Sequence, residues 1–126
     1  MGDWLEDYYA DVDAMRMDAF IDHHTDDAVL TFANNPPAVG KDQIREAIGG
    51  LWASIGGLRH EIKRRYGDDD HAIIEAVTHY TRQDGSVVSI PSASALGRRD
   101  GKVESLTIYM DLTPLFAPAA AEPAPA

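Results

Sequence analysis

The sequence has no cysteine in its 126 residues, which excludes disulfide bonds, thiolate nucleophiles and thiolate metal sites. It has no apolar run near the roughly 20 residues that a membrane-spanning helix needs. It begins with acidic residues, where a secretory signal would be basic and then apolar. Basic residues are few, 11 against 21 acidic ones, and the formal net charge of −10 repels phosphate backbones and anionic membranes. We therefore expect a cytoplasmic protein that binds neither nucleic acid nor membranes.

Apolar residues make up 44% of the chain, which at this length is enough for one hydrophobic core. We therefore expect a single domain over residues 1–116. Residues 117–126 read APAAAEPAPA, a low-complexity stretch with nothing to bury, and are predicted to be disordered.

Helical spacing of apolar residues dominates the first half of the chain. Asp3 followed by Glu6 is typical of a helix start, and the apolar residues after it predict a helix over about 4–15. A short helix over about 18–24 and a strand over 28–32 come next. After a proline-containing loop, the longest amphipathic pattern predicts a helix from about 40 to 55.

From Leu58 the apolar period changes to two, which predicts a strand with one buried face. Two Asp-Gly turns then separate three more β-rich runs, over about 71–82, 86–97 and 103–111. Helices early in the chain and strands late in it predict an α+β fold. In this fold a curved sheet, antiparallel or mixed, wraps around the N-terminal helices and the one long helix.

Turn lengths predict which residues face each other across the strands. We expect a two-residue turn at Asp84-Gly85, because this dipeptide favours tight hairpins. The paired positions on one face are then His79 with Ile90, Val77 with Ser92 and Glu75 with Ser94.

The preceding hairpin is predicted to bring His60 to the same face. A four-residue turn over 67–70 pairs His60 with Val77, so that His60 lies diagonal to Glu75 and His79 at about 7–8 Å. His60 alternates with apolar Leu58 and Ile62, so we expect this face to be buried.

A cluster of His60, Glu75 and His79 is the main hypothesis for a site. Imidazole titrates near neutral pH, and a carboxylate in apolar surroundings has a raised pKa, so such groups exchange protons with a bound molecule. Two alternatives stay open. The three groups bond only to one another in a filled core, or a bulge turns them outward.

Five segments follow the order and spacing of a known family: DDAVLTF, NNPPAVGKDQI, LRHEI, VTHYTRQDG and GKVESLTIYMDLTPLF. Over residues 4–116 the chain resembles the SnoaL-like branch of the nuclear transport factor 2 superfamily. This branch includes polyketide cyclases, ketosteroid isomerases and limonene epoxide hydrolases. The resemblance implies a cone-shaped fold enclosing a pocket, frequent homodimers through the outer sheet face, and usually no cofactor.

The resemblance carries over few catalytic residues. Tyr8 matches the oxyanion-hole tyrosine of ketosteroid isomerases, but Phe32 stands at their base aspartate and Ser94 near their protonated aspartate. The residues at the catalytic positions of limonene epoxide hydrolase are Leu30, Phe32, Glu75, Val77 and Ile108. Both known catalytic sets are therefore incomplete.

We therefore expect a cofactor-independent acid/base enzyme that isomerises, cyclises, dehydrates or hydrolyses a small hydrophobic molecule. His60 and His79 are the predicted acid and base, Glu75 orients or activates one of them, and Tyr8 is the fourth candidate. The alternative is a non-catalytic domain that binds a hydrophobic ligand or contributes a dimer surface. The predicted substrate-binding residues are Tyr9, Phe32, Leu51, Trp52, Ile55, Ile90, Ser92, Ser94, Leu106, Ile108 and Met110.

His23 and His24 lie close to three aspartates, and such residues bind zinc or iron. Adjacent residues at a helix end point apart, however. We therefore expect a solvated helix terminus here and no metal site.

Overall fold

The computed structural model describes residues 3–116, which form the predicted helices and strands in the predicted order, with a short strand at Ala38–Val39 and a short helix at Thr113–Phe116 in addition. The elements are α1 (Trp4–Asp13), α2 (Met17–Asp22), β1 (His24–Phe32), β2 (Ala38–Val39), α3 (Gly40–Ala53), β3 (Gly57–Gly67), β4 (His71–Thr81), β5 (Val87–Arg99), β6 (Lys102–Tyr109) and α4 (Thr113–Phe116). The tail that we predicted to be disordered lies outside the described residues.

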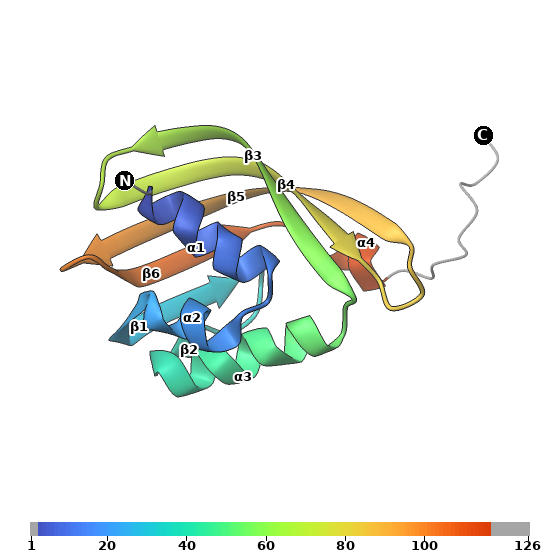
Figure 1. The fold of residues 1–126 in the computed structure, drawn as a ribbon, viewed down its shortest axis with the longest axis horizontal. Helices are drawn as coiled ribbons and strands as arrows, with labels where there is room; N and C mark the ends of the chain where they lie inside the picture. Colours follow the sequence, from blue (N-terminus) through green and yellow to red (C-terminus); the bar gives the residue numbers. More distant parts are fainter. Residues whose placement is uncertain (1–2, 117–126) are drawn as a thin grey trace.

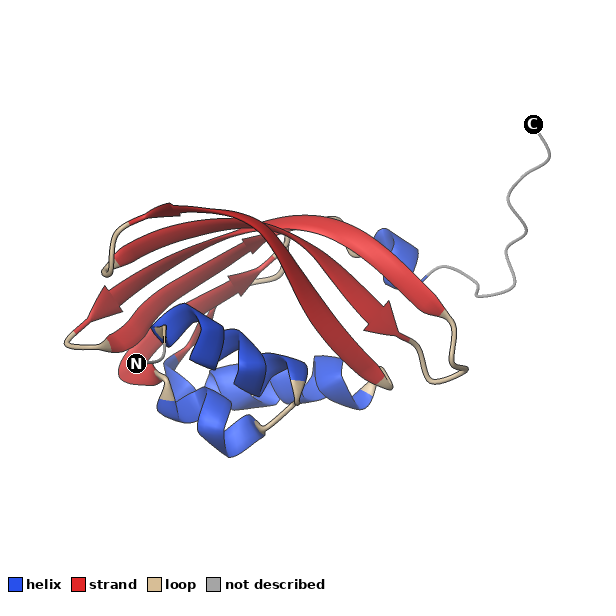
Figure 2. Cartoon of the chain, turned by 45° about the horizontal axis from the view of Figure 1, so that its top comes forward, coloured by secondary structure: helices blue, strands red, loops and turns tan. Residues whose placement is uncertain are grey.

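The strands form one six-stranded sheet in the order β2-β1-β6-β5-β4-β3. Strands β1 and β6 are parallel, and every other neighbouring pair is antiparallel. The long strands arch over α1, α2 and α3, which lie together on the concave side of the sheet (Figures 1 and 2). The predicted α+β fold, with a curved mixed sheet wrapped around the helices, is confirmed.

The helices pack through the apolar stripes that predicted them. Helix α1 buries Leu5, Tyr8, Tyr9 and Val12, and the Asp3 side chain accepts a hydrogen bond from the Leu5 N–H at 2.9 Å. Helix α3 buries the residues Ile44, Ile48 and Trp52.

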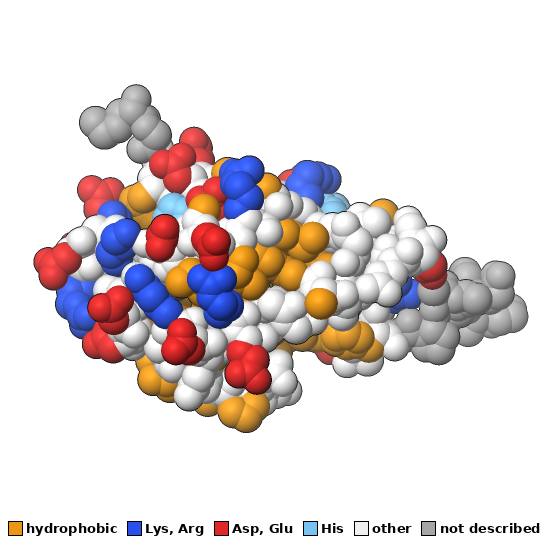
Figure 3. Space-filling model, turned by 60° about the horizontal axis from the view of Figure 1, so that its bottom comes forward, with side chains coloured by type: hydrophobic (Ala, Val, Ile, Leu, Met, Phe, Trp, Pro, Cys, Tyr) orange, Lys and Arg blue, Asp and Glu red, His pale blue; other side chains and the backbone are white. Residues whose placement is uncertain are grey.

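On the face of the molecule seen in Figure 3, charged side chains gather at one end and hydrophobic ones lie toward the middle. No helix among the described residues is long and apolar enough to cross a membrane.

The predicted register between β4 and β5 is wrong by one residue. The Arg82 N–H donates to the Ser86 carbonyl at 2.7 Å, and Gly85 has a φ of +89°, so the loop has three residues instead of two. His79 therefore faces Ser89, and not Ile90. A shift of one residue moves every side chain to the opposite face of a strand.

The register between β3 and β4 differs from the prediction for a second reason. The turn spans residues 68–71 instead of 67–70, because Gly67 pairs with Ala72, and a bulge between Ile62 and Arg64 then shifts the pairing back by one residue. His60 consequently pairs with Thr78 instead of Val77. Because His79 is the neighbour of Thr78 along β4, His60 and His79 point to opposite faces of the sheet.

Candidate functional site

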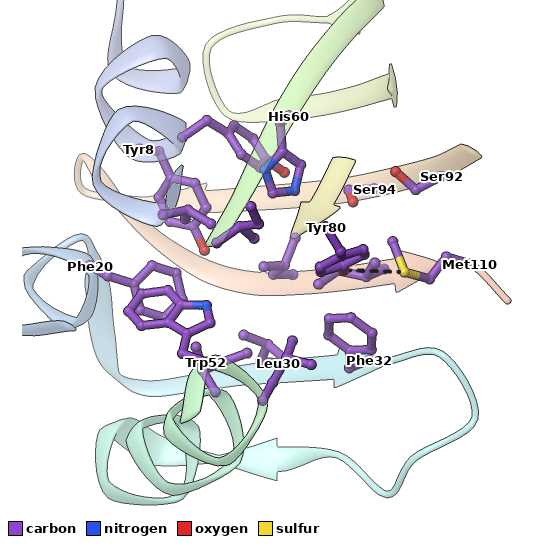
Figure 4. A pocket seen from close by; sticks show the side chains of 17 residues that line it. Tyr8, Phe20, Leu30, Phe32, Trp52, His60, Tyr80, Ser92, Ser94 and Met110 are labelled. Atoms are coloured by element: carbon purple, nitrogen blue, oxygen red, sulfur yellow. Dashed lines mark hydrogen bonds between the residues drawn. The ribbon is translucent and has the colours of Figure 1, made fainter. Parts of the chain in front are cut away.

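A narrow cavity of about 40 Å³ lies between the helices and the concave face of the sheet (Figure 4). The structure places most of the predicted substrate-binding residues in its wall: Tyr9, Phe32, Leu51, Trp52, Ser92, Ser94, Leu106, Ile108 and Met110. Ile55 and Ile90 are buried but lie elsewhere in the core. Six other apolar and aromatic residues of the wall were not among the predicted substrate-binding residues: Val12, Phe20, Leu30, Ile48, Leu58 and Tyr80.

Side chains fill most of the space behind this wall. A free volume of about 40 Å³ has room for water but not for a whole organic molecule. An open groove of about 480 Å³, lined in part by α3, lies on the other side of Leu30, Phe32, Ile48 and Leu51, which line both spaces. Movement of these four side chains toward the groove would make room for a ligand.

The Asp13 carboxylate holds His60 at the wall of the cavity. One carboxylate oxygen lies 2.6 Å from His60 Nδ1, and the other accepts the His60 backbone N–H at 3.0 Å. The His60 side chain is 13% exposed, and its ring packs against that of Tyr9 with centroids 4.7 Å apart. A carboxylate beside Nδ1 favours the tautomer with a proton there, which leaves Nε2 as an acceptor.

His60 also borders solvent. It lines a shallow surface groove together with Asp3, Glu6 and Arg65. Nε2 makes no hydrogen bond to another described residue. His60 therefore lies between the cavity and the outside, where it can exchange protons with water.

A second imidazole, that of His24, contacts the hydroxyl group of Tyr8 on α1. His24 is 2% exposed, and its Nε2 lies 2.9 Å from the Tyr8 hydroxyl. The expectation that His24 is part of a solvated helix terminus is wrong, because β1 begins at His24 and directs it inward. Neighbouring His23 binds Asp11 at 2.7 Å.

The hydroxyl groups of the cavity stay protonated at neutral pH. Burial raises the pKa of Tyr8 well above its usual value, and burial raises that of Tyr9 as well. Burial also raises the pKa of Tyr80 to about 12, and its hydroxyl donates to Met110 Sδ at 3.6 Å, the dashed line in Figure 4. The described residues of the cavity wall therefore offer neutral hydroxyl groups and no carboxylate.

Two predicted catalytic residues lie on the outer face of the sheet, which is a correction of the predicted cluster. The His79 Nδ1 lies 2.7 Å from the Ser89 Oγ, and the His79 Nε2 lies 3.0 Å from a Glu61 carboxylate oxygen. Glu75 accepts the Tyr66 hydroxyl at 2.9 Å. The β3–β4 pairing with its bulge separates both residues from His60, and the three-residue loop separates them from Ser92 and Ser94. Tyr8 and His60 remain in the cavity wall.

Comparison with protein families supports the resemblance. The family model of the SnoaL-like domain matches residues 5–106. The chain belongs to the SnoaL-like domain family. No curated protein matches it.

Solved structures share the fold of this SnoaL-like domain at low identity. A protein with a ketosteroid isomerase-like fold from Catenulispora acidiphila DSM 44928, in complex with trimethylamine, is 22% identical with a TM-score of 0.81, covering 98% of this chain and 99% of that chain. TerC, co-crystallised with polyporic acid, is 15% identical with a TM-score of 0.76, covering 86% and 88%. A protein described as a SnoaL-like polyketide cyclase, from Jannaschia sp. CCS1, is 17% identical with a TM-score of 0.71, covering 85% and 80%.

Two polar residues of the site, Asp13 and His24, were not among the predicted site residues. Asp13 lies four residues after Tyr9 on the buried stripe of α1, and that spacing was a usable signal. His24 had no comparable signal, because an irregularity between His24 and Val29 interrupts the alternation of β1, and Asp26, which alternation would also place inside, is exposed. Among residues 3–116, no group of three or more His, Asp or Glu side chains is arranged to hold a metal ion.

Proposed function

We propose that this domain binds a small, largely apolar organic molecule in the cavity and that His60 exchanges a proton with it without a cofactor. The contact between Asp13 and His60 carries the proposal. It directs one ring nitrogen to a carboxylate at 2.6 Å and leaves the other free at the wall of an apolar cavity. Asp13 takes the orienting role that we predicted for Glu75.

The chemistry that fits this pair is proton abstraction next to a carbonyl group. Nε2 of His60 takes the proton as the C–H bond breaks, and the bonding electrons move to the carbonyl oxygen to form an enolate. The imidazolium that results is stabilised by the Asp13 carboxylate. In a carbonyl compound with a neighbouring C=C bond the product is a dienolate, and return of the proton to its far carbon moves the double bond and isomerises the molecule. Return to the same carbon leaves the molecule unchanged.

A second function is favoured by the family's catalytic positions. Both known catalytic sets of the family are incomplete in this chain, with Phe32 and Ser94 at or near the positions of two aspartates. A domain that binds a hydrophobic ligand without converting it would also have these features. The two functions differ in whether a bound carbonyl compound exchanges protons.

Deuterium exchange of phenylacetone in heavy water separates the two functions without knowledge of the natural substrate. Phenylacetone is apolar and has acidic protons between its ring and its carbonyl group. We expect the protein to accelerate their exchange. His60→Gln should lower that rate by about 100-fold or more, the usual contribution of general acid–base catalysis, and Asp13→Asn should lower it less.

His79→Gln is the matched control, because His79 lies on the outer face and is not part of the proposed site. Its exchange rate should equal that of the wild type. An equal loss in the His60 and His79 variants would contradict the assignment. Binding of phenylacetone, seen by NMR, without faster exchange would leave the non-catalytic function.

We also propose that two copies of the chain associate through the outer face of the sheet. Large side chains on this face are exposed, with Tyr66 and Ile73 at 50% and Tyr109 at 62%. Ile73→Lys should shift the molecular mass measured by light scattering from dimer toward monomer. Glu46→Lys, at an exposed position on α3 on the opposite side of the sheet, should not. A monomeric wild type would refute this proposal.

A further inference from the structure

His24 is buried at a position where an apolar side chain would lose less solvation free energy. It is 2% exposed, and its ring packs against the rings of Phe20 and Tyr8 with centroids 4.7 Å and 5.4 Å apart. A polar group without water loses solvation energy that its hydrogen bonds must offset. The one hydrogen bond of this ring to a described side chain is the 2.9 Å contact with the Tyr8 hydroxyl.

The position of the ring proton determines whether the Tyr8 hydroxyl donates or accepts the hydrogen bond with His24. Burial lowers the pKa of His24 to about 4, against the opposing effect of the Ile21 and Phe20 carbonyl groups, so the ring is neutral and carries one proton. Nδ1 is buried without a well-formed hydrogen bond to any described group. The Ile21 and Phe20 carbonyl groups act on the ring as acceptors, and Nε2 already contacts the Tyr8 hydroxyl, so we infer that Nδ1 is the nitrogen on their side. A lone pair there would be repelled by carbonyl oxygens, whereas an N–H would be attracted to them. The proton therefore belongs on Nδ1, and Nε2 accepts.

We propose that His24 is a positioning residue that makes the Tyr8 hydroxyl donate to Nε2, so that Tyr8 presents an acceptor to the cavity. The ligand group that reaches Tyr8 is then a hydrogen-bond donor, such as a phenolic or alcoholic hydroxyl. This inference rests on the proposed ligand-binding function. It differs from the oxyanion-hole role that the resemblance implied for Tyr8, because a tyrosine in that role donates to the ligand. In Figure 4 the Tyr8 hydroxyl points toward Phe20 and Trp52, into the aromatic end of the cavity wall.

The first test reads the ring proton directly and needs no ligand. NMR of the imidazole nitrogens in isotope-labelled protein at neutral pH distinguishes the two tautomers, and His24→Gln identifies the signal of His24 by removing it. We expect a protonated Nδ1 and an unprotonated Nε2. A protonated Nε2 would overturn the proposal, because Tyr8 would then be free to donate to a ligand.

The second test compares phenol, which donates and accepts a hydrogen bond, with anisole, which only accepts. We expect the wild type to bind phenol about tenfold more tightly than anisole, the effect of one hydrogen bond to a buried partner. Tyr8→Phe should remove this preference. His24→Leu should reduce it by freeing the Tyr8 hydroxyl to donate to anisole.

The outcomes separate this inference from the function on which it rests. A wild type that binds anisole as tightly as phenol overturns the inferred ligand class while leaving ligand binding intact. A wild type that binds neither probe overturns both the ligand class and ligand binding in this cavity. In that case the NMR signal still decides whether His24 orients the Tyr8 hydroxyl.

Discussion

Replacing His24 with leucine is expected to remove a pH dependence from the stability of the fold. Burial holds the pKa of His24 at about 4 in the folded chain, below the ordinary value of 6.5. Between these two values the unfolded chain binds a proton at His24 and the folded chain does not. The free energy of unfolding therefore falls as the pH drops from 6.5 toward 4.

The size of the effect follows from the two pKa values. Each unit of difference corresponds to about 1.4 kcal/mol. At about pH 4.5 the loss relative to pH 8 is roughly 2.5 kcal/mol, because the folded chain has begun to bind the proton as well. That is a large part of the total stability of a small domain, which is about 5–15 kcal/mol.

Urea unfolding followed by tryptophan fluorescence at a series of pH values measures this effect. The informative quantity is the difference in free energy of unfolding between wild type and His24→Leu, since titrations shared by both proteins cancel. This difference should change by roughly 2.5 kcal/mol between pH 8 and 4.5. A difference that stays constant over that range would refute the argument that His24 is buried as a neutral ring.

Three further substitutions test the packing. Gly67→Ala should destabilise the fold by about 2 kcal/mol or more in urea unfolding, because Gly67 has a φ of +110° and a Cβ would lie 1.9 Å from the His71 carbonyl oxygen. Gly50→Ala, in α3 with open space around it, should instead stabilise by about 0.5–1 kcal/mol. Phe32→Ala should lower the free energy of unfolding by about 2–3 kcal/mol and join the cavity to the groove. The fluorescence of added anilinonaphthalene sulfonate should then increase. An unchanged fluorescence would contradict the shared wall.

The order of the elements could be predicted because each depends on a pattern along one segment. The stripe of α1 and the alternation that starts at Leu58 are local signals, and both elements are present. The predicted ends of two elements differ from the observed ones. Helix α1 ends at Asp13, two residues before the predicted end, because Met15 adopts a φ of +52°, and strand β1 begins earlier, at His24.

The strand register could not be predicted, because it depends on backbone geometry that one dipeptide does not determine. Asp84-Gly85 fits a two-residue turn, but Gly85 also permits the left-handed conformation that closes a three-residue loop. No feature of the sequence around Lys63 predicted the bulge. The bulge left Glu75 and His79 on the face opposite His60, and the loop separated them from Ser92 and Ser94. A bulge of this kind was one of the alternatives left open.

Helix α1 connects the stability of the fold to the chemistry of the cavity. It contacts three histidines through its own side chains: Tyr8 with His24, Asp11 with His23, and Asp13 with His60. These histidines belong to the segment around the start of β1 and to β3, which the sheet order places far from each other. A ligand that changes the protonation of one imidazole therefore changes the free energy of the contacts between that imidazole and α1. By the same linkage, a mutation that loosens α1 should weaken ligand binding even where it leaves the wall of the cavity unchanged.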